Sequence, residues 1–185
     1  IPLESVMAKS WNKKIFKQID DKVNQASKDL AEERGACPDA AEYGYKERFS
    51  NKTAIAPTAS ISIICGGASP GVEPIAANSY THKTLSGSFN VRNRYLEEIL
   101  ESHGKNDDET WSTITTNQGS VSHLDFLTDL EKDVFKTAFE LNQKWIIELS
   151  GDRTPFISQA QSVNIFLPAD VHKKELHRIH FDAWK

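Results

Sequence analysis

Segments with helical hydrophobic periodicity alternate with short apolar runs along this chain. This alternation restricts the possible folds more than any other feature of the sequence. From about Asn12 to Arg34, apolar residues recur every three or four positions, as on one face of an amphipathic helix. Gly35 then predicts the end of that helix. The same periodicity predicts helices over Arg92–His103 and Lys173–Lys185.

A further helix is predicted to begin with a capping box. Thr128 and Glu131 have the spacing at which a threonine hydroxyl and a glutamate carboxylate each accept a bond from an otherwise unpaired backbone amide. The apolar residues that follow continue the helical period to about Ser150, and Gly151 predicts the end of the helix.

Strand-like segments lie between these helices. Ser79–Val91 has strand and turn character, with the turn around Ser86 and Gly87, and Val163–Leu167 is an apolar run typical of a buried strand. Ile61–Cys65 fits either a buried strand or the first turn of a helix. Residues 36–50 and 105–109 are expected to be loops. Helices alternating with short apolar strands favour an α/β architecture with parallel strands.

The size and charge of the chain exclude several classes of function. A chain of 185 residues with a net charge of -4 and a pI near 5.9 lacks the dense positive charge of a nucleic-acid surface. It contains no apolar run long enough to cross a bilayer, so no membrane partner and a cytoplasmic location are expected. Cys37 and Cys65 have no metal-ligand spacing and are expected to be free thiols. Because the start lacks methionine and the last helix looks unfinished, residues 1–185 are expected to be a single fragment, truncated at both ends.

The strongest chemical feature is the hydroxyl-rich segment Pro57–Ser62. It is followed by a cluster of glycine and proline residues that includes Gly66, Gly67, Gly71 and Pro74. Successive amides and hydroxyls can bind a phosphate without a cationic side chain, especially where a helix begins at the same place. The alternative is a turn whose hydroxyls bond to their own backbone, and composition alone favours that alternative.

Other polar residues carry weaker functional signals. His172, His177 and His180 cluster near the end, but no carboxylate or cysteine completes a metal site, so none is predicted. Glu73 has the chemistry of an acid or base, although a carboxylate in such a loop more often pairs locally. The thiol of Cys65 is expected to be buried, and neither cysteine is placed to be a nucleophile. The polar residues of Gln159–Asn164 are expected to join a hydrogen-bond network.

Six short segments, in this order and at these spacings, resemble the large catalytic subunit of ribonucleotide reductase. The resemblance is to the ribonucleoside-diphosphate form of bacteria and phages, and it covers essentially the whole chain. The segments are Leu30–Gly35, Pro57–Ser62, Gly71–Pro74, Leu85–Phe89, Asn117–Val121 and Gln159–Asn164.

This resemblance implies a fold and a set of site residues. The family's catalytic domain is a ten-stranded α/β barrel made of two parallel halves, and this chain resembles part of the second half, with its packed helices. The matching positions imply that Thr58, Ala59, Ser60, Ile61 and Ser62 bind the substrate phosphates. Ala59 and Ile61 contribute only backbone groups.

The resemblance also implies what must come from elsewhere. In this family a thiyl radical abstracts the 3′-hydrogen of the ribose, a cysteine pair supplies electrons, and the thiyl lies in an Asn-x-Cys-x-Glu element. This sequence has no such element and no adjacent tyrosine pair, and neither Cys37 nor Cys65 matches a catalytic cysteine. No catalytic residue is therefore assigned, and the fragment is expected to be inactive alone and to bind no cofactor.

The parent enzyme implied by the resemblance has several partners. It would reduce ribonucleoside diphosphates, form a homo-oligomer of large subunits, and depend on a small radical-generating metal subunit and on ATP or dNTP effectors. Thioredoxin or glutaredoxin would supply electrons to the cysteines of this enzyme. Two alternatives remain open, namely a fragment of the cobalamin-dependent branch of the same superfamily and a non-catalytic phosphate-binding module. A fragment with open strand edges and apolar helix faces is expected to be poorly soluble in isolation.

Overall fold

The structure is a computed structural model that describes residues 1–66, 68–85 and 87–185. Within those ranges the chain is mainly helical, and its strands form one hairpin. In chain order the elements are α1 (Val6–Arg34), α2 (Pro38–Glu42), α3 (Ala59–Cys65), β1 (Ser79–Thr84), β2 (Gly87–Arg92), α4 (Arg94–Ser102), α5 (Asp108–Thr116), α6 (Asp129–Val134), α7 (Gln143–Arg153), the short 3-10 helix η1 (Thr154–Phe156) and α8 (Lys173–Trp184).

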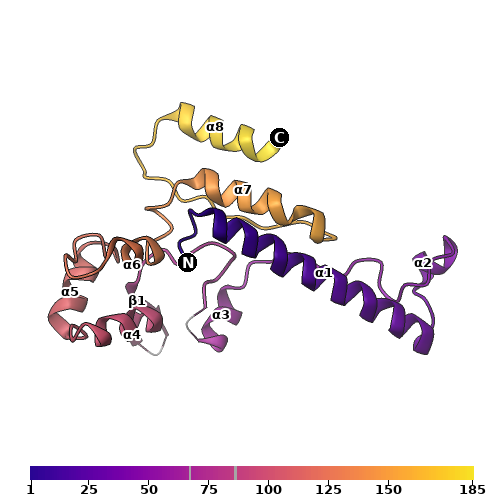
Figure 1. Cartoon of the computed structure of the whole chain (residues 1–185), viewed down its shortest axis with the longest axis horizontal. Helices are drawn as coiled ribbons and strands as arrows, with labels where there is room; N and C mark the ends of the chain where they lie inside the picture. The colour runs from indigo at the N-terminus through magenta and orange to yellow at the C-terminus, as the bar shows by residue number, and fades with distance from the viewer. Residues whose placement is uncertain (67, 86) are drawn as a thin grey trace.

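The long helix α1 forms a layer with α7 and α8. It begins at an N-cap in which the Ser5 hydroxyl accepts a bond from the Ala8 amide, and it ends at Gly35, whose φ of 81° favours glycine. The predicted end is therefore confirmed, and the helix starts earlier than expected. Figure 1 shows α1 alongside α7, with α8 beyond α7. The Asn12 side chain donates to the Leu149 carbonyl (2.9 Å) and joins the first two of these helices.

A separate group of elements surrounds the main hydrophobic core. Figure 1 shows α4, α5, α6 and the hairpin gathered at the end of the molecule farthest from α2. Helices α4 and α5 and the segment after them bury seven apolar side chains against one another, and these are Leu96, Leu100, Trp111, Ile114, Val121, Leu124 and Leu127. Glu4 links this group to α1, because its carboxylate pairs with Lys136 (2.9 Å) and accepts from the Asn142 amide (2.7 Å).

The strands pair differently from the pattern that the sequence favours. β1 and β2 are antiparallel, with Ser79 opposite Arg92, which confirms the predicted strand and turn character of Ser79–Val91. Of the turn expected at Ser86 and Gly87, Ser86 lies outside the described residues. Within the described ranges, parallel pairing is limited to one bridge between Ile55 and Gln161, and Val163–Leu167 forms no strand. An extended segment becomes a strand only when a neighbour pairs with its backbone.

Four predictions about helices and loops are corrected by the structure. The helix expected from Thr128 to Ser150 is two helices, because α6 ends at Val134 and the Ala138 amide then bonds to the distant Ile75 carbonyl (2.9 Å). Gly151 lies inside α7 and does not end it. The expected loops at residues 105–109 and 36–50 contain the start of α5 and the short helix α2. Local period and composition do not report such distant bonds.

Other predictions are confirmed. The capping box at Thr128 is present, and the helices expected near residues 92–103 and 173–185 are α4 and α8. The ambiguous segment Ile61–Cys65 is helical and belongs to α3. In the described part of the chain, no helix combines the length and the apolar character needed to cross a membrane.

Candidate functional site

The hydroxyl-rich segment lies at the start of α3. Thr58 is the N-cap residue, and Ala59, Ser60, Ile61 and Ser62 form the first turn, so the five predicted positions lie on one helical turn. All five are at least partly exposed. The local cause is Pro57, which has no amide hydrogen and favours an extended residue before it, so that the helix begins only after it.

Backbone amides of this turn are free to bind an anion. The first amide of the turn with a helical acceptor is that of Ser62, which donates to the Thr58 carbonyl (2.8 Å). Within residues 1–66, 68–85 and 87–185, the amides of Ala59, Ser60 and Ile61 have no acceptor. A helix start presents such amides in one direction together with the positive end of the helix dipole.

The three hydroxyl groups of the segment differ in what they bond to. Thr58 donates its hydroxyl to the Pro70 carbonyl (3.0 Å), and Ser62 donates its own to the Ala59 carbonyl (2.7 Å). The Ser60 hydroxyl makes no hydrogen bond to the described part of the chain and is exposed. Ser60 is therefore the side chain best placed to donate to a ligand at this turn.

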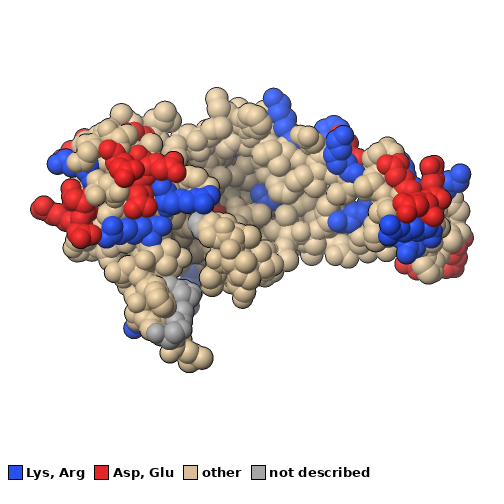
Figure 2. Space-filling view, turned by 90° about the horizontal axis from the view of Figure 1, so that it is seen from below, with Lys and Arg blue, Asp and Glu red and all other residues tan. Residues whose placement is uncertain are grey.

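A cleft of about 220 Å³ lies between α3 and the hairpin. Its lining is mostly apolar or neutral and consists of Ser62, Ile63, Gly66, Ala68, Ile75, Ala77, Tyr80, Val91, Arg92 and Asn93. Arg92 is the one charged residue in this lining, and its guanidinium pairs with Asp108 (2.8 Å) and lies over the Trp111 ring. Helix α3, at the lower edge of Figure 1, lies on the face seen in Figure 2, where charged side chains gather toward the two ends and the middle is largely uncharged.

A buried carboxylate lies behind this segment. The Glu73 side chain accepts a bond from the Asn164 amide (2.5 Å) and a longer one from the Asn164 side chain (3.4 Å). Glu73 is only 4% exposed. The carboxylate is paired, as expected, but its partner lies 91 residues away and not within the loop, so the expectation of a local partner was wrong. Glu73 is not among the residues that line the cleft.

The predicted polar network around Gln159–Asn164 is present. The Gln161 side chain accepts from Arg153 (2.7 Å) and donates to the Ser150 carbonyl (3.1 Å), so it ties the segment to α7. Burial lowers the pKa of the Arg153 guanidinium below its usual value, and the negative charge of Glu73 opposes that shift.

The cysteine and histidine residues stay apart. Cys65 ends α3 and is exposed, so the expectation that it is buried was wrong. Its helix packs too little against the rest of the described chain to cover it. Cys37 precedes α2, and both thiols are free, as expected. The His172 ring accepts from the Lys174 amide at the start of α8, and no group of three metal-ligating side chains occurs among the described residues.

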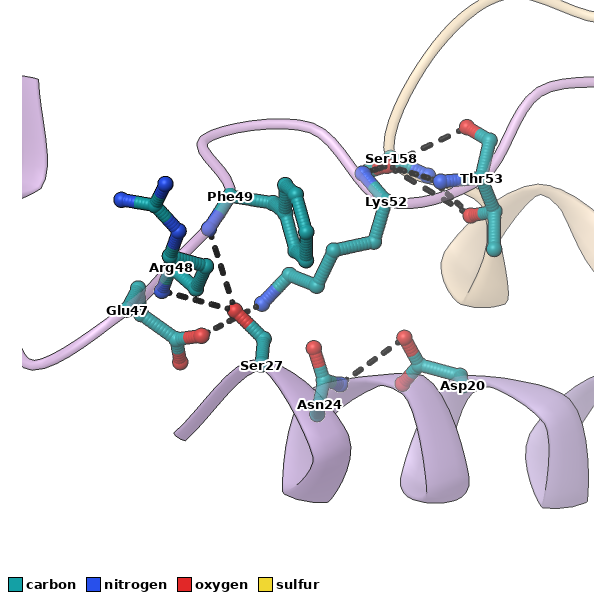
Figure 3. A network of polar contacts seen from close by, with 9 residues as sticks. All are labelled: Asp20, Asn24, Ser27, Glu47, Arg48, Phe49, Lys52, Thr53 and Ser158. Carbon is teal, nitrogen blue, oxygen red and sulfur yellow. Dashed lines mark hydrogen bonds and ion pairs between the residues drawn. The ribbon is translucent and has the colours of Figure 1, made fainter. Parts of the chain in front are cut away.

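A second polar cluster escaped prediction from the sequence, and Figure 3 shows it. The buried Ser27 hydroxyl of α1 accepts bonds from the amides of Arg48 (3.0 Å) and Phe49 (3.2 Å). A hydrogen bond from Ser27 is the main cause that lowers the pKa of Glu47, and pairing with Lys52 (3.2 Å) adds to it. A serine on an otherwise apolar helix face was the available signal. This cluster fastens the segment that leads toward Pro57 onto α1.

Comparisons with known proteins agree on one family. Residues 38–185 match the profile described as ribonucleotide reductase, barrel domain. The ribonucleoside-diphosphate reductase large subunits of Invertebrate iridescent virus 6 and Invertebrate iridescent virus 3 are 47% and 42% identical to this chain over its whole length. The chain spans only 20% and 29% of the lengths of these relatives.

A solved structure gives the same result for the fold. The class Id ribonucleotide reductase alpha subunit of Actinobacillus ureae superposes over the whole chain with a TM-score of 0.90 and 36% sequence identity, and the chain covers 33% of that protein. The predicted fold class, part of an α/β barrel, is therefore confirmed. The single parallel bridge at Ile55 and Gln161 is the parallel pairing retained within the described ranges.

Proposed function

The chain belongs to the ribonucleotide reductase barrel-domain family, and from this membership we propose that it is part of a ribonucleoside-diphosphate reductase large subunit. The observation that carries the proposal is the match over residues 38–185, which includes the whole hydroxyl-rich turn. The whole-length similarity to two viral large subunits supports the same assignment. The shared name of these relatives favours the diphosphate form over the cobalamin-dependent alternative.

In this proposal the first turn of α3 binds the phosphates of the substrate. The free amides of Ala59, Ser60 and Ile61 and the hydroxyl of Ser60 donate to phosphate oxygens, while Thr58 and Ser62 shape the turn. Neutral donors suffice because the helix start adds a partial positive charge. The mostly apolar cleft beside the turn keeps competing water away from one side of the bound group.

The redox chemistry comes from parts of the large subunit beyond these 185 residues. Reduction at the ribose 2′-carbon requires a thiyl radical at the 3′-hydrogen and two electrons from a cysteine pair, which becomes a disulfide as the 2′-hydroxyl leaves as water. Cys37 caps a short helix and Cys65 ends another, and neither matches the family's catalytic cysteines. The chain alone would therefore bind phosphate groups and not turn over.

The remaining partners follow from the same assignment. We propose that the complete enzyme takes ribonucleoside diphosphates, receives its radical from a small metal-containing subunit, and is regulated by ATP or dNTP effectors. Thioredoxin or glutaredoxin would reduce it, its large subunits would associate with one another, and it would act in the cytoplasm on precursors for DNA replication. These proposals rest on the names of the relatives and on the resemblance of the motifs.

A chimeric enzyme tests the assignment. Residues 1–185 would replace the aligned segment of the Invertebrate iridescent virus 6 large subunit, and reduction of a ribonucleoside diphosphate would be assayed with the small subunit of that virus. We expect turnover by the chimera and none by residues 1–185 alone. A folded chimera that binds the substrate without reducing it would instead favour a non-catalytic phosphate-binding module.

Replacing Ser60 tests the phosphate contact within the chimera. Ser60→Ala removes a hydrogen bond to a charged group, which costs about 1–3 kcal/mol, so we expect KM to rise by about 5-fold to 160-fold. Ser10→Ala is the matched control, because Ser10 is an exposed serine on a different helix, α1. An unchanged KM for the Ser60 variant would refute the assignment of this turn.

A further inference from the structure

The turn that begins α3 is held by a loop that lies later in the sequence. Both the amide and the hydroxyl of Thr58 donate to the Pro70 carbonyl, at 2.9 and 3.0 Å. The N-cap residue determines the direction in which the first amides of a helix point. The position of Pro70 therefore sets the orientation of the free amides at Ala59, Ser60 and Ile61.

The loop that carries Pro70 is fixed by Glu73. The Ser69 hydroxyl donates to the Glu73 carbonyl (2.5 Å), which closes the loop on itself. A Cβ atom added to Gly71 would overlap the Glu73 carboxylate, so the side chain packs directly on the loop backbone. The same carboxylate accepts two bonds from Asn164 and is thereby held in place.

Asn164 in turn belongs to a segment that pairs with the chain just before the turn. The Ile55 amide donates to the Ala160 carbonyl (3.2 Å), and the Ser162 amide donates to the Ile55 carbonyl (2.9 Å). The polar contacts therefore close a ring, which we call the Glu73 ring. It runs from Ile55 through Thr58, Pro70, Glu73 and Asn164 and returns to Ile55 through Ser162. Residues 55–58 are held from both sides.

The Glu73 carboxylate is the part of this ring whose hydrogen bonds an apolar side chain could not make. Glu73 is almost completely buried, and no cation lies within ion-pair distance of it among the described residues. A buried carboxylate is costly unless donors satisfy it, and here Asn164 supplies both donors. Removing the carboxylate would leave the Asn164 amide unpaired and would break the link between the loop of Pro70 and the segment that carries Asn164.

We propose that Glu73 is a positioning residue which, through the Glu73 ring, orients the first turn of α3 for the phosphates of the substrate. This inference rests on the proposed function of that turn. Glu73 does not touch the substrate in this arrangement, because its carboxylate points toward Asn164. Its effect is on substrate affinity and not on the chemical step.

The test uses the chimeric large subunit with three variants. Glu73→Ala removes the acceptor, Glu73→Gln retains one oxygen for the Asn164 amide, and Gly71→Ala pushes the carboxylate aside without removing it. We expect the alanine variant at Glu73 to raise KM for a ribonucleoside diphosphate about tenfold or more, with kcat per active site changed less than about twofold. The Gln variant should recover part of the affinity, and Gly71→Ala should raise KM as Glu73→Ala does.

A purely structural role would give a different result. Ser27→Ala is the matched control, because it also removes a buried acceptor of two hydrogen bonds, here from the backbone amides of Arg48 and Phe49, but lies on α1 outside the Glu73 ring. It should lower the melting temperature and leave KM unchanged. The proposal would be supported if all these variants lowered the melting temperature equally and only the Glu73 and Gly71 variants raised KM.

Two outcomes separate this proposal from the one on which it rests. If Ser60→Ala raises KM while the folded Glu73→Gln and Gly71→Ala variants leave it unchanged, the positioning role is refuted and the phosphate site stands. If Ser60→Ala also leaves KM unchanged, the phosphate site is refuted and the positioning role with it. Should Glu73→Ala fail to fold, the Gln and Gly71 variants still decide between these outcomes.

Discussion

Individual side chains at the start of α3 have divided roles. Thr58 and Ser62 use their hydroxyl hydrogens within the protein, whereas Ser60 keeps its own available. A hydroxyl already committed to a carbonyl can still accept a bond, but it cannot donate a second one. The donors available to an anion at this turn are therefore the Ser60 hydroxyl and a few backbone amides. For this reason we expect the Ser60 substitution to weaken phosphate binding.

Glu131 provides a residue-scale prediction about pH. Its carboxylate accepts bonds from the amide and the hydroxyl of Thr128, chiefly, and also from His103, and these lower its pKa from 4.5 to about 2. Because the folded pKa lies below the unfolded one, its contribution to stability is complete above pH 4.5 and is lost as the pH falls toward about 2.

The variant Glu131→Gln should therefore be less stable than the parent at pH 6, and the difference should shrink as the pH falls from 4.5 to about 2. The measurement is urea unfolding followed by tryptophan fluorescence, with the chain kept dilute enough not to associate. Asp129→Asn is the control on the same helix. A stability difference that stays constant over this range would contradict the assignment.

The residues at which a helix begins and ends depend on caps, which are local, and on hydrogen bonds to distant segments. Helix α6 starts at its capping box, which is complete within four residues, and ends after Val134 where the chain turns toward Ile75. The next helix, α7, begins at a new cap in which the Asn142 side chain accepts from the Lys144 amide. The apolar period continues across both helices, so periodicity alone did not reveal the second cap.

Gly151 provides the element-scale prediction. It lies within α7, and a Cβ atom added there would meet nothing within 4 Å. Gly151→Ala should therefore stabilise the folded chain by about 0.5–1 kcal/mol, because alanine loses less backbone entropy in a helix. Urea unfolding of the dilute chain would measure this change. Gly35→Ala is the comparison, because Gly35 has a positive φ and its replacement should destabilise. A loss of stability at Gly151 would mean that the helix ends there.

At the scale of the whole molecule, many apolar side chains have no cover. On α1, Trp11 and Ile15 are 52% and 48% exposed, and Ile63 and Ile64 of α3 are also exposed. The relatives are three to five times longer than this chain, so the remaining parts of a large subunit are the expected cover for such faces. Exposed apolar patches of this kind favour association in solution.

We therefore predict that residues 1–185 associate when concentrated. Size-exclusion chromatography at tens of micromolar, roughly the range in which exposed apolar surface drives aggregation, should give a heterogeneous profile. Ile15→Lys should shift the profile toward monomer, whereas Lys22→Glu, which exchanges one exposed charge for another on the same helix and removes no apolar side chain, should not. A monodisperse parent chain with one cooperative melting transition would contradict this prediction.

Features that depend on neighbours along the chain could be predicted from the amino-acid sequence. The end of α1 at Gly35, the capping box at Thr128 and the position of the hydroxyl-rich turn each involve contacts within a few residues. Hydrophobic period and cap chemistry are local, so they can be read without knowing the fold. The order of motifs such as Pro57–Ser62 was enough to indicate the family.

Features that depend on distant partners could not be predicted from the sequence and became visible only in the fold. Ala138 bonds to Ile75 and interrupts a helix, Glu73 meets Asn164, and Ile55 pairs with Gln161 across more than half of the chain. Cys65 is exposed because no distant segment of the described chain covers it, although its apolar neighbours suggested burial. Such contacts follow from how segments far apart in sequence come together, and the local pattern of either segment does not specify that meeting.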